Sequence, residues 1–317
     1  AADRGKISEL TEDEIQYLYD ICTSRERIVS VERGQEIVTT TDSTGRFFFM
    51  AFAPIHIKAE AESWERGLCV DTYELSHIDY SYKQVKMILP NEQSTMESCQ
   101  MDMTIPLLYG AMPNLGLYTK PDGPVDSWSE LLPMGKIAEA RASQEEAVEH
   151  ALRDIVYVAG GMYEAGADGI NMDTVGASGD ADFLVGLMAA ETLREKYPDF
   201  PIEMGGAGEF VLGMHADLYY DGVRLAGLYA HKQAKLAQKA GVTIFGPAIN
   251  TNCSMSFPWN IARVVTFVKA CSQAVDIPIH VNVGMGVGGI PMTMNAPLEI
   301  VSRASKAIVE VGKADGL

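Results

Sequence analysis

Short apolar runs alternate with helical patterns along most of this 317-residue chain, and this alternation constrains the fold more than any other feature. The apolar runs are Ala167–Met172, Pro201–Met204, Val242–Phe245 and Ile277–Val283. The helical patterns that accompany them are Gln144–Ala165, Ala181–Lys196, Leu225–Ala240, Trp259–Ala274 and Pro297–Val311. The runs begin 34 to 41 residues apart, which is typical of βα units and indicates a parallel sheet.

Each apolar run leads into a polar or glycine-rich loop: "DTVGASGD", "EMGGAGE", "GPAINTNCS" or "NVGMGVGG". A TIM-type (β/α)₈ barrel places its active site at this end of every strand. Val70–Tyr73, Met103–Tyr109 and a run at 47–52 or 78–82 raise the strand count to seven. Ala314–Leu317 repeats the phrase that opens the run at Ala167 and would begin an eighth strand. We therefore expect an α/β barrel whose eighth strand is truncated, with an open seven-stranded sheet as the alternative.

The first part of the chain has a different pattern. Thr11 and Glu14 form a capping box ahead of an amphipathic stretch that reaches Cys22, which predicts a short helix. The segment from Ile28 to Phe52 is rich in Val, Ile, Thr and Phe and is interrupted by turn residues, which predicts a β-hairpin. We expect residues 1–60 to form an N-terminal extension. Residues 61–317 would form the barrel catalytic domain, with its C-terminal part missing.

The charge balance narrows the class of partner. The chain has 25 Lys and Arg against 43 Asp and Glu, for a net charge of −18, and it has no basic cluster. This argues against nucleic acid and anionic membranes and favours small molecules or proteins. Five cysteines without a C-x-x-C pair indicate a reducing compartment, so we expect a cytoplasmic protein without a membrane span.

Three carboxylates stand at or beyond the predicted strand ends: Asp173, Glu203 and Glu209. Carboxylates in such places neutralise a cation or move a proton, and we assign them as the candidate catalytic groups. The alternative is that each caps the following helix, where a carboxylate is stabilised by unpaired N–H groups. For Glu203 we favour function, since a barrel strand is a poor capping site.

Amides and a histidine supply the candidate substrate-binding groups. His280 and Asn282 alternate with apolar neighbours, so they share one face of their strand, and a barrel would turn that face inwards. Asn250 and Asn252 repeat the same two-residue spacing one unit earlier. For His280 the alternative is a structural histidine in the core.

The sequence from Gly284 to Gly289 matches the G-x-G-x-x-G pattern of dinucleotide sites. That motif requires a helix to open on the last glycine, and Pro291 and Pro297 prevent this here. We expect Gly284 and Gly286 instead to let the backbone come close to a bound cofactor.

A metal site is not expected. His215, Asp217 and His231 are possible zinc ligands, but their spacing matches no known site and Cys253 is isolated.

Several longer phrases carry a resemblance to a known family. They are "LSHIDYSYK", "IPLLYGAMPNLGLYTKPDGP", "ADGINMDTVGASGD", "GAGEFVLGMHADLYYDGVRLAGLYAHKQA", "GVTIFGPAINTN", "PWNIARVVTFVKA" and "VNVGMGVGGIPM". Together they resemble the dimethylamine methyltransferases of methylamine-using microbes over nearly all of residues 65–317. The resemblance implies a barrel enzyme that moves a methyl group from dimethylamine to the Co(I) corrinoid of a small partner protein.

The same resemblance implies an unusual residue. Many family members carry pyrrolysine, and in them a phrase similar to "VGKADGL" directly precedes it. We therefore expect pyrrolysine immediately after Leu317, where this sequence stops. Without it, the chain would be an inactive fragment, a subunit that binds the corrinoid protein, or a pyrrolysine-independent demethylase of another amine. An incomplete barrel would leave strand edges unpaired, so we also expect a homo-oligomer.

Overall fold

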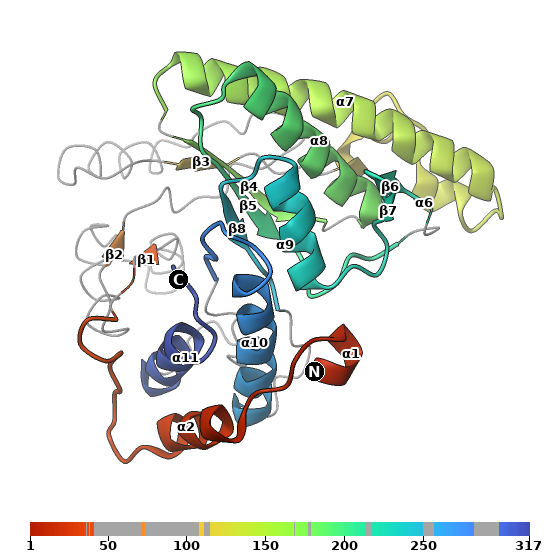
Figure 1. Ribbon diagram of the computed structural model, residues 1–317. Coiled ribbons are helices and arrows are strands. Elements are labelled where there is room, and N and C mark those ends of the chain that lie inside the picture. Colours follow the sequence, from red (N-terminus) through yellow and green to blue (C-terminus); the bar gives the residue numbers. More distant parts are fainter. Residues whose placement is uncertain are drawn as a thin grey trace, which may run out of the picture. The chain divides into compact units, whose positions relative to one another are not determined.

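The computed structural model describes residues 1–35, 37, 39–40, 72–73, 108–110, 115–167, 169–176, 179–213, 217–249, 257–281 and 298–317. The chain divides into two compact units (Figure 1). The first comprises Ala1–Ile78, Ile88–Leu107 and Gly246–Leu317, and the second comprises Asp79–Met87 and Leu108–Phe245.

A parallel sheet forms the centre of the second unit. Its strands are β3 (Leu108–Gly110), β4 (Gly169–Val175), β5 (Ile202–Gly206) and β8 (Ile244–Gly246), in that spatial order. The β3–β4 and β4–β5 pairs are parallel, as the strand–helix alternation predicts. Neighbours in sequence are thus neighbours in the sheet, which is the order that successive βα units produce.

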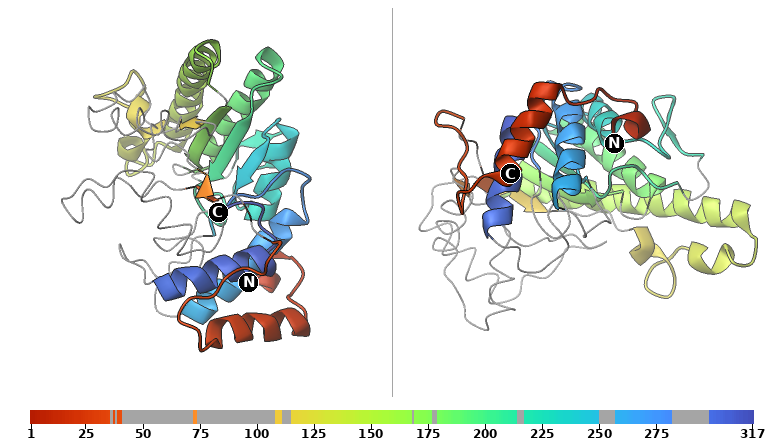
Figure 2. Two further views of the ribbon diagram at one scale, coloured as in Figure 1. Left: turned by 90° about the vertical axis from the view of Figure 1, so that its left-hand side faces the viewer. Right: turned by 90° about the horizontal axis from the view of Figure 1, so that it is seen from below.

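Three helices cover one side of this sheet (Figures 1 and 2): α7 (Ile137–Glu164), α8 (Asp180–Lys196) and α9 (Ala230–Lys239). The packing of α8 is tight, since a Cβ added at Gly186 would lie 2.5 Å from Val175 Cγ1 and 3.5 Å from Met204 Cε. The predicted α/β class with a parallel sheet is therefore confirmed. Closure into a barrel stays a prediction.

Two helices begin five or more residues away from the sequence expectation. Helix α7 begins at Ile137 instead of Gln144, because the preceding "IAEARAS" is rich in strong helix formers and buries Ala140. Helix α9 begins at Ala230 instead of Leu225, because the preceding segment includes Gly227 with a φ of +84°, which no helix allows.

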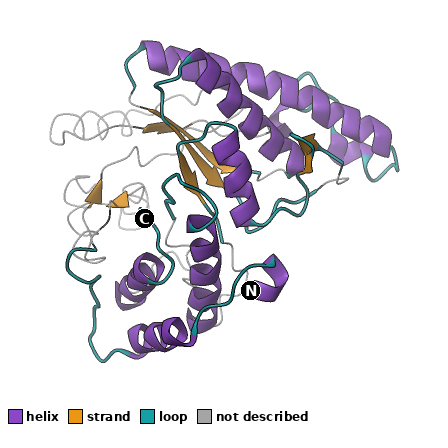
Figure 3. Cartoon of the chain, viewed as in Figure 1, coloured by secondary structure: helices purple, strands orange, loops and turns teal. Residues whose placement is uncertain are grey.

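The segment between β5 and α9 is a long excursion from the sheet. It contains the antiparallel hairpin of β6 (Tyr219–Tyr220) and β7 (Val223–Arg224), turned by Asp221 and Gly222 with φ values of +48° and +74°. Two positive φ values at an Asp-Gly pair are typical of the tight turn that suits hairpin twist. Figure 3 shows the two strands apart from the main sheet.

The first unit is built mainly from α1 (Ala2–Gly5), α2 (Glu12–Thr23), α10 (Phe257–Ser272) and α11 (Leu298–Glu310). The capping box at the start of α2 is confirmed: Thr11 Oγ1 accepts from the Glu14 amide, and Glu14 Oε2 accepts from the Thr11 amide. Within the described residues, the second unit also contains the short elements η1 (Leu115–Tyr118) and α6 (Trp128–Leu131).

Several hydrogen bonds and ion pairs hold the beginning of the chain against α11. The guanidinium of Arg303 donates to the carbonyls of Ser24, Glu26 and Arg27. Nearby, Lys306 donates to the Ser30 carbonyl. The Arg27 guanidinium also pairs with Glu299 of α11, so both backbone carbonyls and side chains hold the N-terminal segment.

The predicted hairpin within 28–52 is not formed by the part that is described. Strand β1 (Thr39–Thr40) pairs in parallel with β2 (Thr72–Tyr73), whereas a hairpin requires antiparallel neighbours. The proposed turn at 43–45 lies outside the described residues.

The last four residues, Ala314–Leu317, form hydrogen bonds of the kind that a parallel strand makes. His280 and Gly316 form a parallel bridge, the Val281 amide donates to the Gly316 carbonyl at 2.9 Å, and the Asp315 amide donates to the Ile279 carbonyl at 2.9 Å. Ala314–Leu317 therefore lies beside residues 279–281, in the parallel direction that an eighth strand would take.

In the described part of the chain, none of the helices combines the length and the apolar character needed to cross a bilayer.

Candidate active site

The register of the sheet brings two polar residues side by side. Asn171 on β4 lies opposite Gly110 on β3 and opposite Glu203 on β5. Partners in a parallel ladder point to the same face, so Asn171 and Glu203 form a polar pair on adjacent strands.

This pair lies on the face that turns away from the helices. Ile170 and Met172 flank Asn171, Ile202 and Met204 flank Glu203, and all four apolar side chains are fully buried. Met204 lies near α8 at Gly186, so alternation directs Glu203 and Asn171 to the opposite face. In a barrel this face is the interior, which is where the sequence analysis placed the polar groups.

A β-bulge separates this pair from the end of β4. The ladder between β4 and β5 shifts register between Met172 and Val175. Strict alternation would put Val175 on the same face as Asn171, yet its side chain contacts the α8 side at Gly186. The bulge thus reverses which side of the sheet the β4 side chains point to, just after Asn171. Bulges beside functional sites often redirect a side chain in this way.

Glu203 is buried, with 5% of its surface exposed. An ionised carboxylate is costly to bury unless hydrogen bonds or a cation compensate for it. Glu203 is also inside a strand and precedes no helix directly, so the capping alternative does not apply to it. Its location suits binding of a cation.

Glu209 lies in the loop after β5 and is 3% exposed. The N-cap of the following helix α9 is Tyr229, and that cap has no side-chain hydrogen bond. Glu209 instead meets the helix through its backbone, because its carbonyl accepts from the Ala230 amide at 2.9 Å.

The buried amide of Gln233 fixes both ends of the excursion that contains Glu209. Its Nε2 donates to the carbonyls of Leu228 at 2.9 Å, Gly208 at 3.2 Å and Glu209 at 3.5 Å. Three carbonyl acceptors around one amide nitrogen fix its orientation, since carbonyls accept only. Gln233 is 2% exposed, so these bonds are shielded from water and hold Glu209 in place.

The loop after β4 is fixed by a second buried group. Asp182 Oδ2, in the first turn of α8, accepts from the Gly176 amide at 3.0 Å, and Asp182 is fully buried. A Cβ added at Gly179 would lie 2.8 Å from the carbonyl oxygen of Leu212, so the loops after β4 and β5 are packed together.

The structure describes the other predicted site residues only in part or not at all. Asp173 is on the backbone of β4, and its side chain lies outside the description. His280 is half-buried in the first unit and pairs with Gly316. Asn250, Asn252, Asn282, Gly284 and Gly286 lie outside the described residues, so their roles stay predictions.

The weak zinc hypothesis concerned residues that the structure describes only in part. Among the described residues, no three His, Cys, Asp or Glu side chains come together in a metal-binding group. Asp217 pairs with Arg141 at 2.5 Å, and His231 is buried on α9. Burial lowers the pKa of His231, and the neighbouring charges of Lys232 and Lys235 lower it further.

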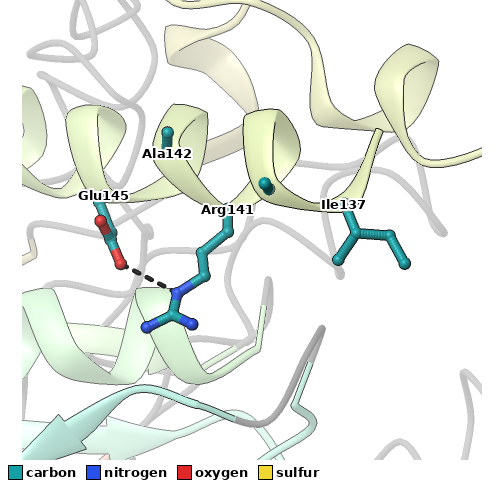
Figure 4. Close-up of a pocket in the computed structure, with 5 residues that line it drawn as sticks. Ile137, Arg141, Ala142 and Glu145 are labelled. Carbon is teal, nitrogen blue, oxygen red and sulfur yellow. Dashed lines mark hydrogen bonds and ion pairs between the residues drawn. The ribbon is translucent and has the colours of Figure 1, made fainter. Parts of the chain in front are cut away.

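A shallow surface pocket of about 650 Å³ lies at the start of α7 and is lined by Ile137, Ala138, Arg141, Ala142 and Glu145 (Figure 4). The Arg141 guanidinium points towards Glu145, 3.2 Å away, and also pairs with Asp217. Because two carboxylates already neutralise this arginine, the pocket is poorly suited to an anion. None of the predicted site residues lines it.

Sequence reasoning missed Asn171 and Gln233. The signal for Asn171 is present in "GINMD", where it alternates with Ile170 and Met172 just as Glu203 alternates with its neighbours. For Gln233 the sequence offers no signal, because its three acceptors are backbone carbonyls brought together by the excursion.

Comparison with known proteins gives one clear match. The family model described as "Dimethylamine methyltransferase (Dimeth_PyL)" matches residues 1–317.

Solved structures give only distant likenesses. The spore cortex-lytic enzyme SleL of Bacillus megaterium QM B1551 is 10% identical with a TM-score of 0.44, over 89% of this chain and 59% of its own. The homocysteine methyltransferase MmuM of Escherichia coli is 12% identical with a TM-score of 0.39, and the match covers 87% of this chain and 97% of MmuM. The YdjI aldolase of Escherichia coli K12 is 12% identical with a TM-score of 0.31, and the match covers 96% of this chain and 98% of YdjI. The chain thus spans about three fifths of SleL, and these likenesses are too weak to support a function.

Proposed function

This chain belongs to the dimethylamine methyltransferase family, and from that premise we propose that it transfers a methyl group from dimethylamine to the Co(I) corrinoid of a partner protein, with monomethylamine as the second product. The observation that supports this most is the buried Glu203, paired with Asn171 on the face of a parallel sheet that turns away from α8. We place the reaction at that face, inside a closed barrel.

The substrate chemistry fits a buried carboxylate. Dimethylamine is a cation near neutral pH, and a cation compensates the cost of burying Glu203. Protonation also makes the nitrogen a better leaving group, so a site that binds the ammonium form favours the transfer. Glu203 would hold the ammonium, and the second buried carboxylate, Glu209, would supply the proton that keeps the nitrogen in its ammonium form until the methyl group is transferred.

When bound, the corrinoid of the partner would supply a Co(I) nucleophile with the electron pair for the bond to the transferred methyl group. The carbon–nitrogen electron pair stays on the nitrogen, so dimethylammonium leaves as neutral monomethylamine. The protein's own contribution is to orient one methyl group outwards and to exclude water around the charged nitrogen.

We also propose the remaining elements that the resemblance implies. Pyrrolysine would follow Leu317 and supply an electrophilic imine, and Gly284 and Gly286 would let the backbone approach the corrinoid. His280, Asn250, Asn252 and Asn282 would orient the substrate, with Asp173 as a third carboxylate. The bridge between Gly316 and His280 supports this, since the residue after Leu317 would continue a strand that runs beside the His280 strand.

The decisive experiment is dimethylamine-dependent methylation of the Co(I) corrinoid protein, followed by its absorbance change. The reading frame is produced with and without amber suppression. We expect turnover from the suppressed product and none from the 317-residue product. Turnover by the 317-residue product would contradict the pyrrolysine proposal, and no turnover by either product would contradict the methyltransferase proposal. Binding of the corrinoid protein without turnover would favour the binding-subunit alternative.

A further inference from the structure

Among the described residues, Asn171 has an acceptor without a hydrogen-bond donor, beside the proposed substrate carboxylate. Its Oδ1 is buried and has no hydrogen-bond partner within the described part of the chain. Buried polar atoms in folded proteins are nearly always hydrogen-bonded, and leaving one unbonded is costly. An amide oxygen accepts hydrogen bonds only, so the partner that it lacks is a donor.

The register places this acceptor next to Glu203. The two residues are direct partners in the β4–β5 ladder, where strands lie about 4.8 Å apart. A tetrahedral nitrogen that donates two hydrogen bonds of about 2.8 Å spans acceptors about 4.6 Å apart. One ammonium nitrogen between the two side chains would therefore reach both.

We propose that Asn171 is a substrate-binding residue that, with Glu203, selects a secondary ammonium ion by accepting one of its two N–H groups. This inference rests on the proposed function, since it concerns the same substrate. Dimethylammonium has two N–H donors and satisfies both acceptors. Trimethylammonium has one, so it cannot donate to both residues, and when it donates to Glu203 the Asn171 Oδ1 receives no hydrogen bond from it. Monomethylammonium has three, so one N–H is left to find another partner.

The two acceptors have different roles. Glu203 provides charge and attracts any methylated ammonium, whatever its number of N–H groups. Asn171 is neutral and discriminates only by hydrogen bonding. A site that is built to hydrogen-bond a polar group rejects an analogue that lacks it, because its own buried acceptor is left unpaired.

The test measures binding of methyl-, dimethyl-, trimethyl- and tetramethylammonium chloride by calorimetry to the wild type and to variants. Asn171→Leu keeps the size of the side chain and removes the acceptor, and Asn171→Asp is the matched control that keeps it. We expect the preference for dimethylammonium over trimethylammonium to fall about tenfold in Asn171→Leu and to persist in Asn171→Asp. Glu203→Gln should weaken binding of all four cations.

An unchanged preference in Asn171→Leu would overturn the inference and leave the methyltransferase proposal intact. If Asn171→Leu does not fold, as judged by circular dichroism, Asn171→Ala also removes the acceptor and is measured with the same outcomes. A wild type that binds none of the four cations would count against both the inference and the proposed function, and the corrinoid methylation assay then separates the two.

Discussion

Gly179 and Leu212 are in such close contact that a Cβ on Gly179 would stand 2.8 Å from the Leu212 carbonyl oxygen. One residue belongs to the loop after β4 and the other to the excursion after β5. The loops that follow the two strands of the Asn171–Glu203 pair are therefore packed as one structure, and a change in one is transmitted to the other.

Substitution at Gly179 tests this contact. Gly179 has a φ of +97°, and Gly222 in the hairpin turn has a φ of +74° with open space around it. Both Gly179→Ala and Gly222→Ala incur backbone strain, but only the first adds a clash with a carbonyl. We expect Gly222→Ala to cost about 1 kcal/mol of unfolding free energy and Gly179→Ala about 3 kcal/mol. Chemical denaturation measures both, and equal losses would show that the two loops are not tightly packed.

Glu203→Gln tests the cation-binding role of the buried carboxylate. The variant keeps the shape and loses the charge, so kcat/KM for methyl transfer should fall roughly 100-fold, with a much smaller change in stability. Glu145→Gln is the matched control, because Glu145 is half-exposed and pairs with Arg141 outside the site. Full activity in Glu203→Gln would exclude Glu203 from the mechanism.

Gln233→Met tests the amide that holds both ends of the excursion. Methionine preserves volume and removes the donors to Gly208 and Leu228, so amide hydrogen exchange in the segments 207–213 and 226–232 should rise about tenfold. Methyl transfer should fall as well, because Glu209 is no longer fixed. Gln238→Met on the same helix is the control. Exchange that is the same in both variants would rule out this function of Gln233.

His231 should make the protein less stable in mild acid. Its pKa is lowered in the folded state by burial and by Lys232 and Lys235, so the unfolded chain takes up a proton at a higher pH than the folded one. The resulting loss begins as pH falls below the usual histidine pKa of about 6.5 and ends at the lowered folded pKa. His231→Leu should flatten the pH dependence of the unfolding free energy between about pH 7 and 5. A profile identical to that of the wild type would contradict this account.

Local signals in the sequence predicted the elements well where those signals are self-contained. The capping box of Thr11 and Glu14 depends on residues three apart, and α8 was predicted to within a residue at its start, at Ala181 against Asp180. The parallel pairing of β4 with β5 followed from the spacing of βα units, and Glu203 was identified from its place in a strand. Burial of apolar neighbours and the two-residue period of a strand determine these features, and both are visible in one dimension.

Only the tertiary structure decided how these elements meet. The bulge after Met172 turns Val175 towards α8, although strict alternation would direct it to the other face. The register makes Asn171 the partner of Glu203, and a shift of one residue would have separated them. The three carbonyls that Gln233 binds are 5, 24 and 25 residues away in the chain. Sequence by itself determined where the main helices and the strands of the parallel sheet lie, because periodicity and capping depend on near neighbours. Contacts between distant segments depend on register and loop closure, which are set by packing of the whole sheet.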